Sequence, residues 1–283
     1  MTIVVFGATG QLGRHVLTSL RAHGVAPTEV RAVGRNTERL SELAAEGFAT
    51  ARADLDDPPT VRTAVEGADT VLLISASEPG RRLPQHRAVI DAAREAGVER
   101  IVYTSLLDAQ DTAHVLAPEH KATEALLAES GLTTTILRNG WYTENYVGDF
   151  ASARERGVIA NAAGGARIAS APRADYAEAA AVVLTTDGHA GRIYELAGSY
   201  AWTFEEFATA ASRVLGSDVE YRALTDDQEK QALLEAGLDE GTASFVVALA
   251  ADSRHGLLDA SGEQLEALIG HPTASLEDQL RTL

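Results

Sequence analysis

The first half of the chain alternates between short runs of apolar, β-branched residues and longer amphipathic segments. The short runs lie at residues 2–6, 30–33, 48–53, 70–74, 101–104 and 133–137. Runs of this length are typical of strands that are buried on both faces of a parallel sheet. After the first run, Leu12, Val16 and Leu20 recur at the spacing of one helix face. The alternation therefore predicts an α/β protein.

Six strand–helix units in succession predict a Rossmann-like, doubly wound parallel sheet. After Tyr146 the alternation breaks down, and helices are expected at residues 176–185, 204–215 and 226–251. We predict a Rossmann domain over residues 1–140 and a smaller α/β lobe, mainly residues 141–283, that receives the substrate. Residues around 173–198 are expected to return to the first domain. The second lobe is expected to cover the carboxyl ends of the strands, where ligands bind in such sheets.

A glycine-rich turn follows the first strand directly. The sequence Gly7-Ala8-Thr9-Gly10-Gln11-Leu12-Gly13 lies between an apolar strand and an amphipathic helix. Gly7 permits a tight turn, Gly10 allows a pyrophosphate to approach the backbone, and Gly13 allows close packing of helix and sheet. The helix N-terminus offers free N–H groups to phosphate oxygens. This context predicts a dinucleotide site formed by Gly7, Thr9, Gly10, Gln11, Leu12 and Gly13. The alternative is an ordinary strand-to-helix turn with incidental glycines.

The end of the second strand indicates which dinucleotide is bound. NAD-binding folds usually carry an acidic residue here that accepts hydrogen bonds from the ribose 2′-hydroxyl. This chain has Arg35 instead, and the next acidic residue is Glu38. A guanidinium can bind a 2′-phosphate, so Arg35 favours NADPH, with NADH as an alternative. The other interpretation of Arg35 is a solvated loop residue.

Three further positions follow strand ends and are expected near the dinucleotide. Asp54 follows the third strand, where it could meet the adenine amino group or simply begin a polar turn. Ser75 follows the fourth strand, and Ser105 follows the fifth. The carboxyl ends of parallel strands share one edge of a sheet, so these side chains are predicted to line the cofactor.

Composition excludes several classes of function. The chain of 283 residues carries 24 basic and 41 acidic residues, a net charge of −17, which disfavours nucleic acid and anionic membranes as partners. It has no cysteine, which excludes disulfides and thiolate metal sites, and no metal site is expected. The first strand begins at the second residue, and no apolar run reaches membrane-spanning length. We expect a cytoplasmic protein that acts on a small molecule.

Several motifs resemble those of one group of reductases. They are the glycine turn, Leu73-Ile74-Ser75, Pro84-Gln85-His86-Arg87, Tyr103-Thr104-Ser105, His120-Lys121-Ala122-Thr123-Glu124, Leu137-Arg138-Asn139-Gly140-Trp141-Tyr142, Arg173-Ala174-Asp175-Tyr176 and Ile269-Gly270-His271-Pro272. Together they resemble the NmrA-like atypical short-chain dehydrogenases/reductases, and within them the type 2 NAD(P)H:quinone oxidoreductases. The resemblance implies a Rossmann fold and NADPH-dependent hydride transfer to a quinone or a dye-like acceptor. The triphenylmethane dye reductases form a sister group.

The chain departs from the larger superfamily in its catalytic pair. Short-chain dehydrogenases use Tyr-x-x-x-Lys, in which the lysine lowers the tyrosine pKa for proton transfer to a carbonyl. None of the seven tyrosines has a lysine four residues later, and Leu116 and His120 occupy the corresponding positions. A quinone fits this loss, because the charge that develops on it is a stabilised phenolate. Hydride transfer then requires proximity and a hydrogen-bond donor rather than a strong acid.

The candidate donors for the quinone are Tyr142, Asn139 and His120, and Trp141 and Tyr146 are candidates to stack on its ring. For Trp141 and Tyr142 the alternative is ordinary packing in the core.

His120 has three interpretations of its own. It could form a metal pair with Glu124, but no third ligand is evident. It could donate to the nicotinamide ribose, or it could bond to Glu124 on the same helix face.

One alternative function belongs to another class. The NmrA-like group also contains non-catalytic regulators that sense NADP(H) and act through a partner protein, and the missing Tyr-x-x-x-Lys suits these equally. A homodimer is expected for either function, because homodimers are common among proteins of this kind.

Overall fold

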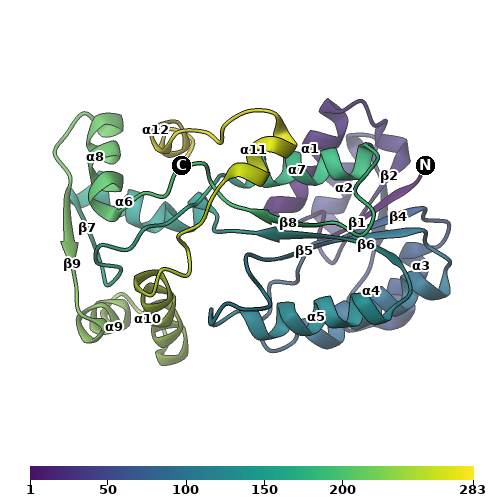
Figure 1. Cartoon of the computed structure of the whole chain (residues 1–283), viewed down its shortest axis with the longest axis horizontal. Helices are drawn as coiled ribbons and strands as arrows, with labels where there is room; N and C mark the ends of the chain where they lie inside the picture. The colour runs from purple at the N-terminus through teal and green to yellow at the C-terminus, as the bar shows by residue number, and fades with distance from the viewer. The chain divides into compact units, whose positions relative to one another are not determined.

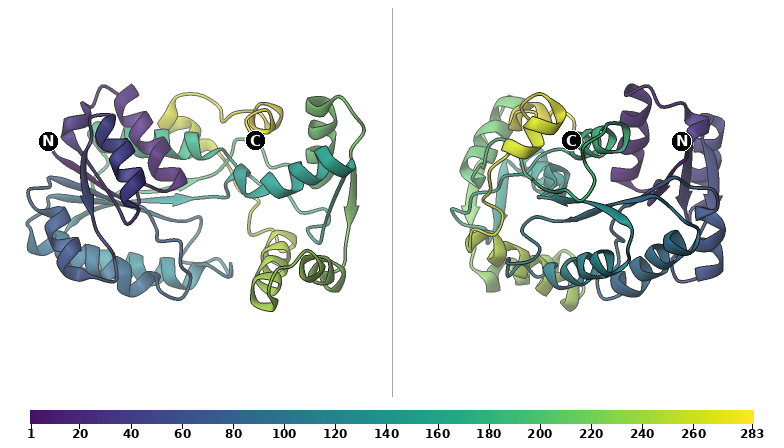
Figure 2. Two further views of the ribbon diagram at one scale, coloured as in Figure 1. Left: turned by 180° about the vertical axis from the view of Figure 1, so that it is seen from behind. Right: turned by 45° about the vertical axis from the view of Figure 1, so that its right-hand side comes forward.

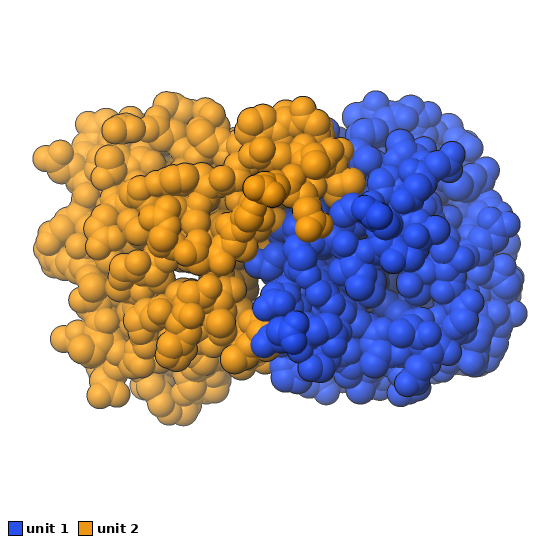
Figure 3. Space-filling view, in the orientation of Figure 1, with its two compact units in different colours: residues 1–111, 116–139, 173–196 blue, residues 112–115, 140–172, 197–283 orange.

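The computed structural model describes all 283 residues and divides into two compact units (Figure 3). Unit 1 comprises residues 1–111, 116–139 and 173–196, and unit 2 comprises residues 112–115, 140–172 and 197–283. None of the helices combines the length and the hydropathy needed to cross a bilayer.

Unit 1 is built on a seven-stranded parallel sheet with the order β3-β2-β1-β4-β5-β6-β8 (Figure 1). Its strands are β1 (Ile3–Phe6), β2 (Val30–Gly34), β3 (Ala49–Arg52), β4 (Thr70–Leu73), β5 (Arg100–Leu106), β6 (Thr133–Asn139) and β8 (Ile193–Leu196). The strand order reverses at β1, which pairs with β2 on one side and with β4 on the other. The predicted doubly wound parallel sheet is confirmed, and the reversal is the point where such sheets bind ligands.

Helices cover both faces of this sheet (Figures 1 and 2). They are α1 (Gln11–Ala22), α2 (Thr37–Ala45), α3 (Pro58–Val65), α4 (Arg82–Glu95), α5 (Ala117–Glu129) and α7 (Arg173–Thr185), with a short 3₁₀ helix η1 (Pro27–Glu29) before β2. On one face α1 packs against α7, and on the other α4 packs against both α3 and α5. This two-sided cover explains why the central strands β1, β4 and β5 are buried at consecutive positions, whereas the edge strand β3 is mostly exposed.

The strands of unit 1 supply its core. All four residues of β1 are at most 1% exposed, and the same holds for Val71, Leu72 and Leu73 of β4. Each such side chain contributes about 1.5–3 kcal/mol through its removal from water. Tyr103 of β5 is also fully buried, among Val89 and Ala93 of α4. The central strands thus form a rigid base from which the loops at their carboxyl ends project.

Unit 2 contains a two-stranded parallel sheet, β7 (Val158–Asn161) and β9 (Glu220–Ala223), and mostly helices. The helices are η2 (Thr143–Tyr146), α6 (Val147–Arg156), α8 (Phe204–Leu215), α9 (Asp226–Glu235), α10 (Glu240–Arg254), α11 (Glu263–Ile269) and α12 (Leu276–Leu280). Its core is aromatic, with Trp202, Phe204 and Phe207 each at most 2% exposed. Their rings meet at centroid distances of 5.1–5.8 Å, within the range of favourable aromatic pairs.

Two helices of unit 1 begin earlier than the apolar pattern indicates. The sequence alone predicts helices over residues 85–96 and 119–130, each directly after a proline, whereas α4 begins at Arg82 and α5 begins at Ala117. Pro84 and Pro118 fall in these first turns, where a missing N–H costs no hydrogen bond. The prolines therefore start the helices and do not precede them.

Candidate functional site

The glycine turn after β1 requires glycine at both of its ends. Gly7 has a φ of +84°, and a Cβ at this position would meet the Ile74 Cβ at 3.1 Å. A Cβ at Gly13 would lie 2.2 Å from the Gly7 carbonyl oxygen and 2.6 Å from the Ala8 Cα. Helix α1 thus approaches the turn more closely than any side chain would permit. The close approach brings the first turn of α1 to the edge of the sheet at the point where the strand order reverses.

The N-terminus of α1 can accept an anion. Gly10 is the N-cap, with an extended backbone, and no side chain caps the helix. The first-turn N–H groups of Gln11, Leu12 and Gly13 have no intrahelical acceptor, and the helix dipole adds positive potential. Gly10 and Gln11 are exposed, whereas the side chain of Leu12 lies in the core, so Leu12 can contribute only its backbone. These residues fit the pyrophosphate of a dinucleotide.

Two arginines lie where β2 ends. Arg35 is half exposed, and its Nη2 lies 2.8 Å from Glu78 Oε1. Arg39, in the first turn of α2, donates from Nη1 to the carbonyl oxygen of Thr9 at 2.8 Å. Asn36 caps α2 by accepting from the Arg39 backbone N–H at 3.0 Å. Arg39 was missed by sequence reasoning, although its position in the helix after β2 is a usable signal.

Asp54 and Ser75 occupy the ends of β3 and β4. Asp54 Oδ1 accepts from the Asp56 N–H at 3.1 Å, which is the polar turn that the sequence offered as its alternative. The Ser75 N–H donates to Thr104 Oγ1 at 2.9 Å, which joins the loop after β4 to β5. Their predicted contacts with a cofactor stay predictions.

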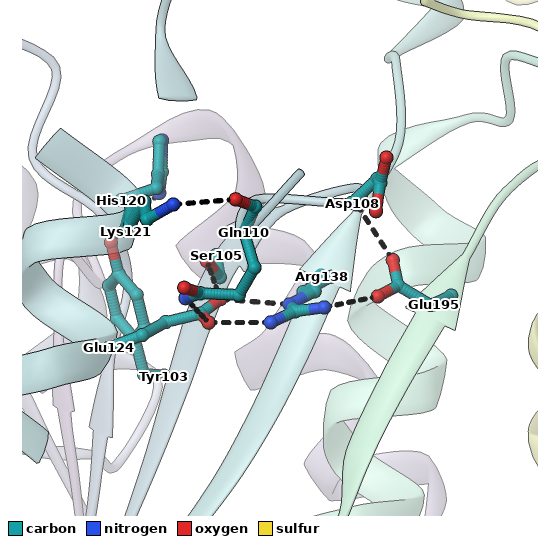
Figure 4. Close-up of polar contacts among 9 residues, drawn as sticks. All are labelled: Tyr103, Ser105, Asp108, Gln110, His120, Lys121, Glu124, Arg138 and Glu195. Carbon is teal, nitrogen blue, oxygen red and sulfur yellow. Dashed lines mark hydrogen bonds and ion pairs between the residues drawn. The ribbon is translucent and has the colours of Figure 1, made fainter. Parts of the chain in front are cut away.

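A buried ionic network lies at the ends of β5, β6 and β8 (Figure 4). Arg138 donates from Nε and Nη2 to the two oxygens of Glu124, at 3.0 and 2.7 Å, and from Nη1 to Glu195 at 2.6 Å. Ser105 Oγ also donates to Glu124, at 2.6 Å, as does the Gln110 amide at 2.6 Å. Burial opposes ionisation of Glu124, but the bonds from Arg138, Ser105 and Gln110 outweigh it and lower its pKa. In the sequence Arg138 is recognisable only as part of the motif at residues 137–142. Nothing local in the sequence pairs it with Glu124 or Glu195.

The same network fixes the loop that follows β5. The Asp108 N–H donates to Glu195 Oε2 at 2.8 Å, and Lys121 Nζ donates to the Gln110 carbonyl oxygen at 2.7 Å. Asp108 has a φ of +52°, the left-handed conformation that residues other than glycine rarely adopt. A strained residue held by charged partners is typical of functional loops.

His120 lies beside Tyr103. Its Nδ1 is 2.8 Å from Tyr103 Oη, and both side chains are buried. Burial raises the pKa of Tyr103 above its ordinary value, so the phenol keeps its proton and can donate it to Nδ1. His120 Nε2 would then carry the remaining proton as a hydrogen-bond donor.

The run after β6 passes from unit 1 to unit 2. Asn139 is the last residue of β6, and its carbonyl oxygen accepts from the Leu107 N–H. In unit 2, the backbone of Tyr142 forms an isolated parallel β-bridge with that of Ala171. The centroid of the Trp141 ring lies 5.8 Å from that of the His114 ring. His114 was not considered at the level of sequence, because its neighbours are distant in the chain.

Tyr146 belongs to the aromatic core of unit 2. Its ring meets those of Trp202 and Phe204 edge to face, at 5.0 and 5.4 Å. Burial raises its pKa well above the ordinary value, and the nearby Asp149 adds to this. This position favours a packing role, and stacking on an acceptor stays a prediction.

The geometry defines a class of protein. A glycine turn between a buried strand and an uncapped helix, placed where the strand order reverses, is the signature of Rossmann-type dinucleotide-binding proteins.

Comparison with known proteins narrows this class to a family. Residues 7–187 match the NAD(P)H-binding family, and the chain belongs to it. Quinone oxidoreductase 2 of Escherichia coli (strain K12) is 45% identical over 282 residues, which are 99% of this chain and 98% of that protein. The crystal structure of the E. coli NADPH-dependent quinone oxidoreductase QOR2 complexed with NADPH is similar with a TM-score of 0.94, at 43% identity and 99% coverage of both chains. Triphenylmethane reductase from Citrobacter sp. complexed with NADP(H) has a TM-score of 0.95, at 34% identity and 100% coverage of both chains. The resemblance stated from the motifs is confirmed.

Proposed function

We propose that this protein is an NADPH-dependent reductase that transfers hydride directly to a quinone or to a quinone-like dye. One observation carries the proposal. The glycine turn and the uncapped helix α1 form a dinucleotide cradle, while Leu116, the N-cap of α5, and His120, within α5, stand in place of the superfamily's tyrosine and lysine. An acceptor that needs no strong acid fits this site. The full-length similarity to QOR2 and to the dye reductase supports the same acceptors.

The cofactor is assigned to unit 1. The N–H groups of Gln11, Leu12 and Gly13 would bind the pyrophosphate, and Gly7, Thr9 and Gly10 shape the turn that presents them. Arg35 and Arg39 would hold the 2′-phosphate, which requires Arg35 to exchange its Glu78 partner for the phosphate. Asp54, Ser75 and Ser105 complete the proposed contacts. Ser105 donates its proton to Glu124, so toward a cofactor it could only accept.

The bound nicotinamide supplies the hydride, and the protein supplies orientation and a hydrogen-bond donor. His120 is the donor we favour, because its hydrogen bond with Tyr103 fixes the orientation of the imidazole at the position of the superfamily's lysine. Asn139 and Tyr142 are the other proposed donors. Trp141, and with less support Tyr146, would pack on the acceptor ring.

The proposal is tested by mixing the purified protein with NADPH and a series of benzoquinones, naphthoquinones and triphenylmethane dyes. The absorbance of the reduced nicotinamide should fall in proportion to enzyme concentration, with one equivalent consumed for each quinone reduced. Oxidation no faster than the uncatalysed rate across the whole series would refute it. If NADPH bound tightly under those conditions without turnover, the sensing alternative would be supported.

We further propose that residues 1–140 serve mainly the cofactor, residues 141–283 mainly the acceptor, and that the protein forms a homodimer. Size-exclusion chromatography with light scattering tests the dimer, and a mass near 29.9 kDa would refute it.

A further inference from the structure

The backbone of one residue, Ala76, in the loop after β4 is held by two side chains of α4. The Ala76 N–H donates to His86 Nε2 at 3.0 Å, and the Ala76 carbonyl oxygen accepts from Arg82 Nε at 2.6 Å. Ala76 is only three residues beyond the end of β4. Loop backbone is usually hydrated, so two buried side chains bonded to the N–H and the carbonyl group of one loop residue are unusual.

The hydrogen bonds of His86 define its tautomer. Its Nδ1 lies 2.9 Å from Thr123 Oγ1, and Thr123 gives its own proton to the Glu119 carbonyl oxygen at 2.8 Å. Nδ1 must therefore carry the imidazole proton, which leaves Nε2 as the acceptor that the Ala76 N–H needs. The ring is fully buried and lies 5.4 Å from the Tyr103 ring, edge to face. His86 can accept from Ala76 only while it stays neutral and in this orientation.

Arg82 is held equally firmly. It is 8% exposed, and its backbone N–H donates to Glu119 Oε1 at 3.1 Å. The other oxygen of Glu119 accepts from the Gly80 N–H at 3.0 Å and lies 4.0 Å from Arg82 Nη1. The carboxylate of α5 thus fixes the start of α4, and the start of α4 fixes Ala76.

The segment that contains Ala76 adjoins the glycine turn. The Ile74 N–H donates to the Phe6 carbonyl oxygen at 3.3 Å, and the Ile74 side chain lies against Gly7. At the far end of the segment, Glu78 pairs with Arg35. Residues 74–78 therefore border both the phosphate-binding turn and the proposed 2′-phosphate site.

We propose that His86 and Arg82 are positioning residues, which hold the backbone of Ala76 so that residues 74–78 keep their place beside the dinucleotide site. Neither residue needs to touch the cofactor. The inference rests on the proposed function in that the site beside the glycine turn binds NADPH. It assigns a role to the Pro84-Gln85-His86-Arg87 motif, which the catalytic proposal leaves unused.

The test compares His86→Leu, which removes the acceptor, with His86→Gln, whose carboxamide oxygen can replace it. His86→Leu should weaken NADPH binding about tenfold, the effect of losing one buried hydrogen bond, while His86→Gln should restore most of the affinity. Dissociation constants come from the fluorescence of bound NADPH. Amide exchange of residues 74–78 should accelerate in His86→Leu without NADPH and slow again in His86→Gln.

His189→Leu is the matched control, because His189 is also bonded through both ring nitrogens, to Thr186 and Tyr194, but adjoins β8. It should leave NADPH affinity unchanged. If His86→Leu does not fold, Arg82→Met removes the other hydrogen bond to Ala76 and should give the same changes in affinity and exchange. A folded His86→Leu or Arg82→Met variant with wild-type affinity and wild-type exchange at residues 74–78 would overturn the inference. Absence of NADPH binding by the wild-type protein would instead overturn the proposed function.

Discussion

Replacement of Gly13 by alanine provides a direct test of the cradle. The added Cβ would lie 2.2 Å from the Gly7 carbonyl oxygen, whereas ordinary contacts begin at 3.4 Å. The atoms that the new Cβ would meet belong to the backbone of Gly7 and Ala8, so no side-chain rotation can relieve the clash. Helix α1 must therefore move away from the turn by about 1 Å, the difference between those two distances.

A shift of this size would break the bonds that the first turn of α1 offers to the pyrophosphate. A bond between an N–H group and a charged oxygen contributes about 1.5–3 kcal/mol. Loss of one or two such bonds costs about 3 kcal/mol in binding, which corresponds to about a hundredfold increase in the NADPH dissociation constant. The same clash should lower the stability of the fold by about 1–3 kcal/mol, as an extra methyl group in a close-packed region usually does.

Isothermal titration calorimetry with NADPH measures the change, and circular dichroism establishes that the variant is folded. Gly148→Ala is the control, because a Cβ there meets nothing within 4 Å and the residue lies in a helix. It should bind NADPH as the wild type does. A folded Gly13→Ala variant with unchanged affinity would refute the assignment of the phosphate site to this turn.

Four further predictions follow from the site. Arg35→Ala should weaken NADPH binding by about tenfold, which is the value of one charge-assisted bond, and leave NADH binding nearly unchanged. Equal losses for both cofactors in parallel titrations would contradict this prediction. Burial, with Arg82 nearby, lowers the pKa of His86 to about 4, below its unfolded value. Urea unfolding should therefore show that wild type loses stability relative to His86→Gln as pH falls from 6.5 toward 4, because the unfolded chain takes up the proton first. The buried carboxyls of Asp149 and Glu229 in unit 2 have raised pKa values, so they stabilise the fold as pH falls. They affect wild type and His86→Gln equally, so the comparison removes their contribution. Arg138→Met should destabilise the fold by about 3–5 kcal/mol in urea, because Glu124 stays buried without its cation, and a loss below 1 kcal/mol would refute that role. His120→Ala should lower kcat about tenfold with the NADPH dissociation constant unchanged, and an unchanged kcat would transfer the donor role to Asn139 or Tyr142.

The sheet and the glycine turn could be predicted because their signals are local. A run such as residues 2–6 is apolar at every position, which is what burial on both faces requires, and the glycines follow within eight residues. Helix starts were less accurate at Arg82 and Ala117, because a proline is compatible both with a loop and with a first helical turn.

The polar network could not be predicted in the same way. Arg138, Glu124 and Glu195 come from three separate elements, and Arg138 and Glu195 are 57 positions apart in the chain. Their pairing depends on strand order and on the register between β6 and β8, which no short pattern specifies. The hydrogen bonds of His86 and Arg82 to Ala76 could not be predicted either, because they depend on where α4 lies over β4.

The return of residues 173–196 to unit 1 has a consequence for biosynthesis. β8 pairs with β6, and α7 packs on α1. Neither β8 nor α7 has been synthesised while the first 140 residues leave the ribosome. During that interval the nascent chain exposes a bare strand edge at β6 and the apolar side of α1, which are features that promote aggregation. Completion of the nucleotide-binding unit must therefore wait until most of the polypeptide has been translated.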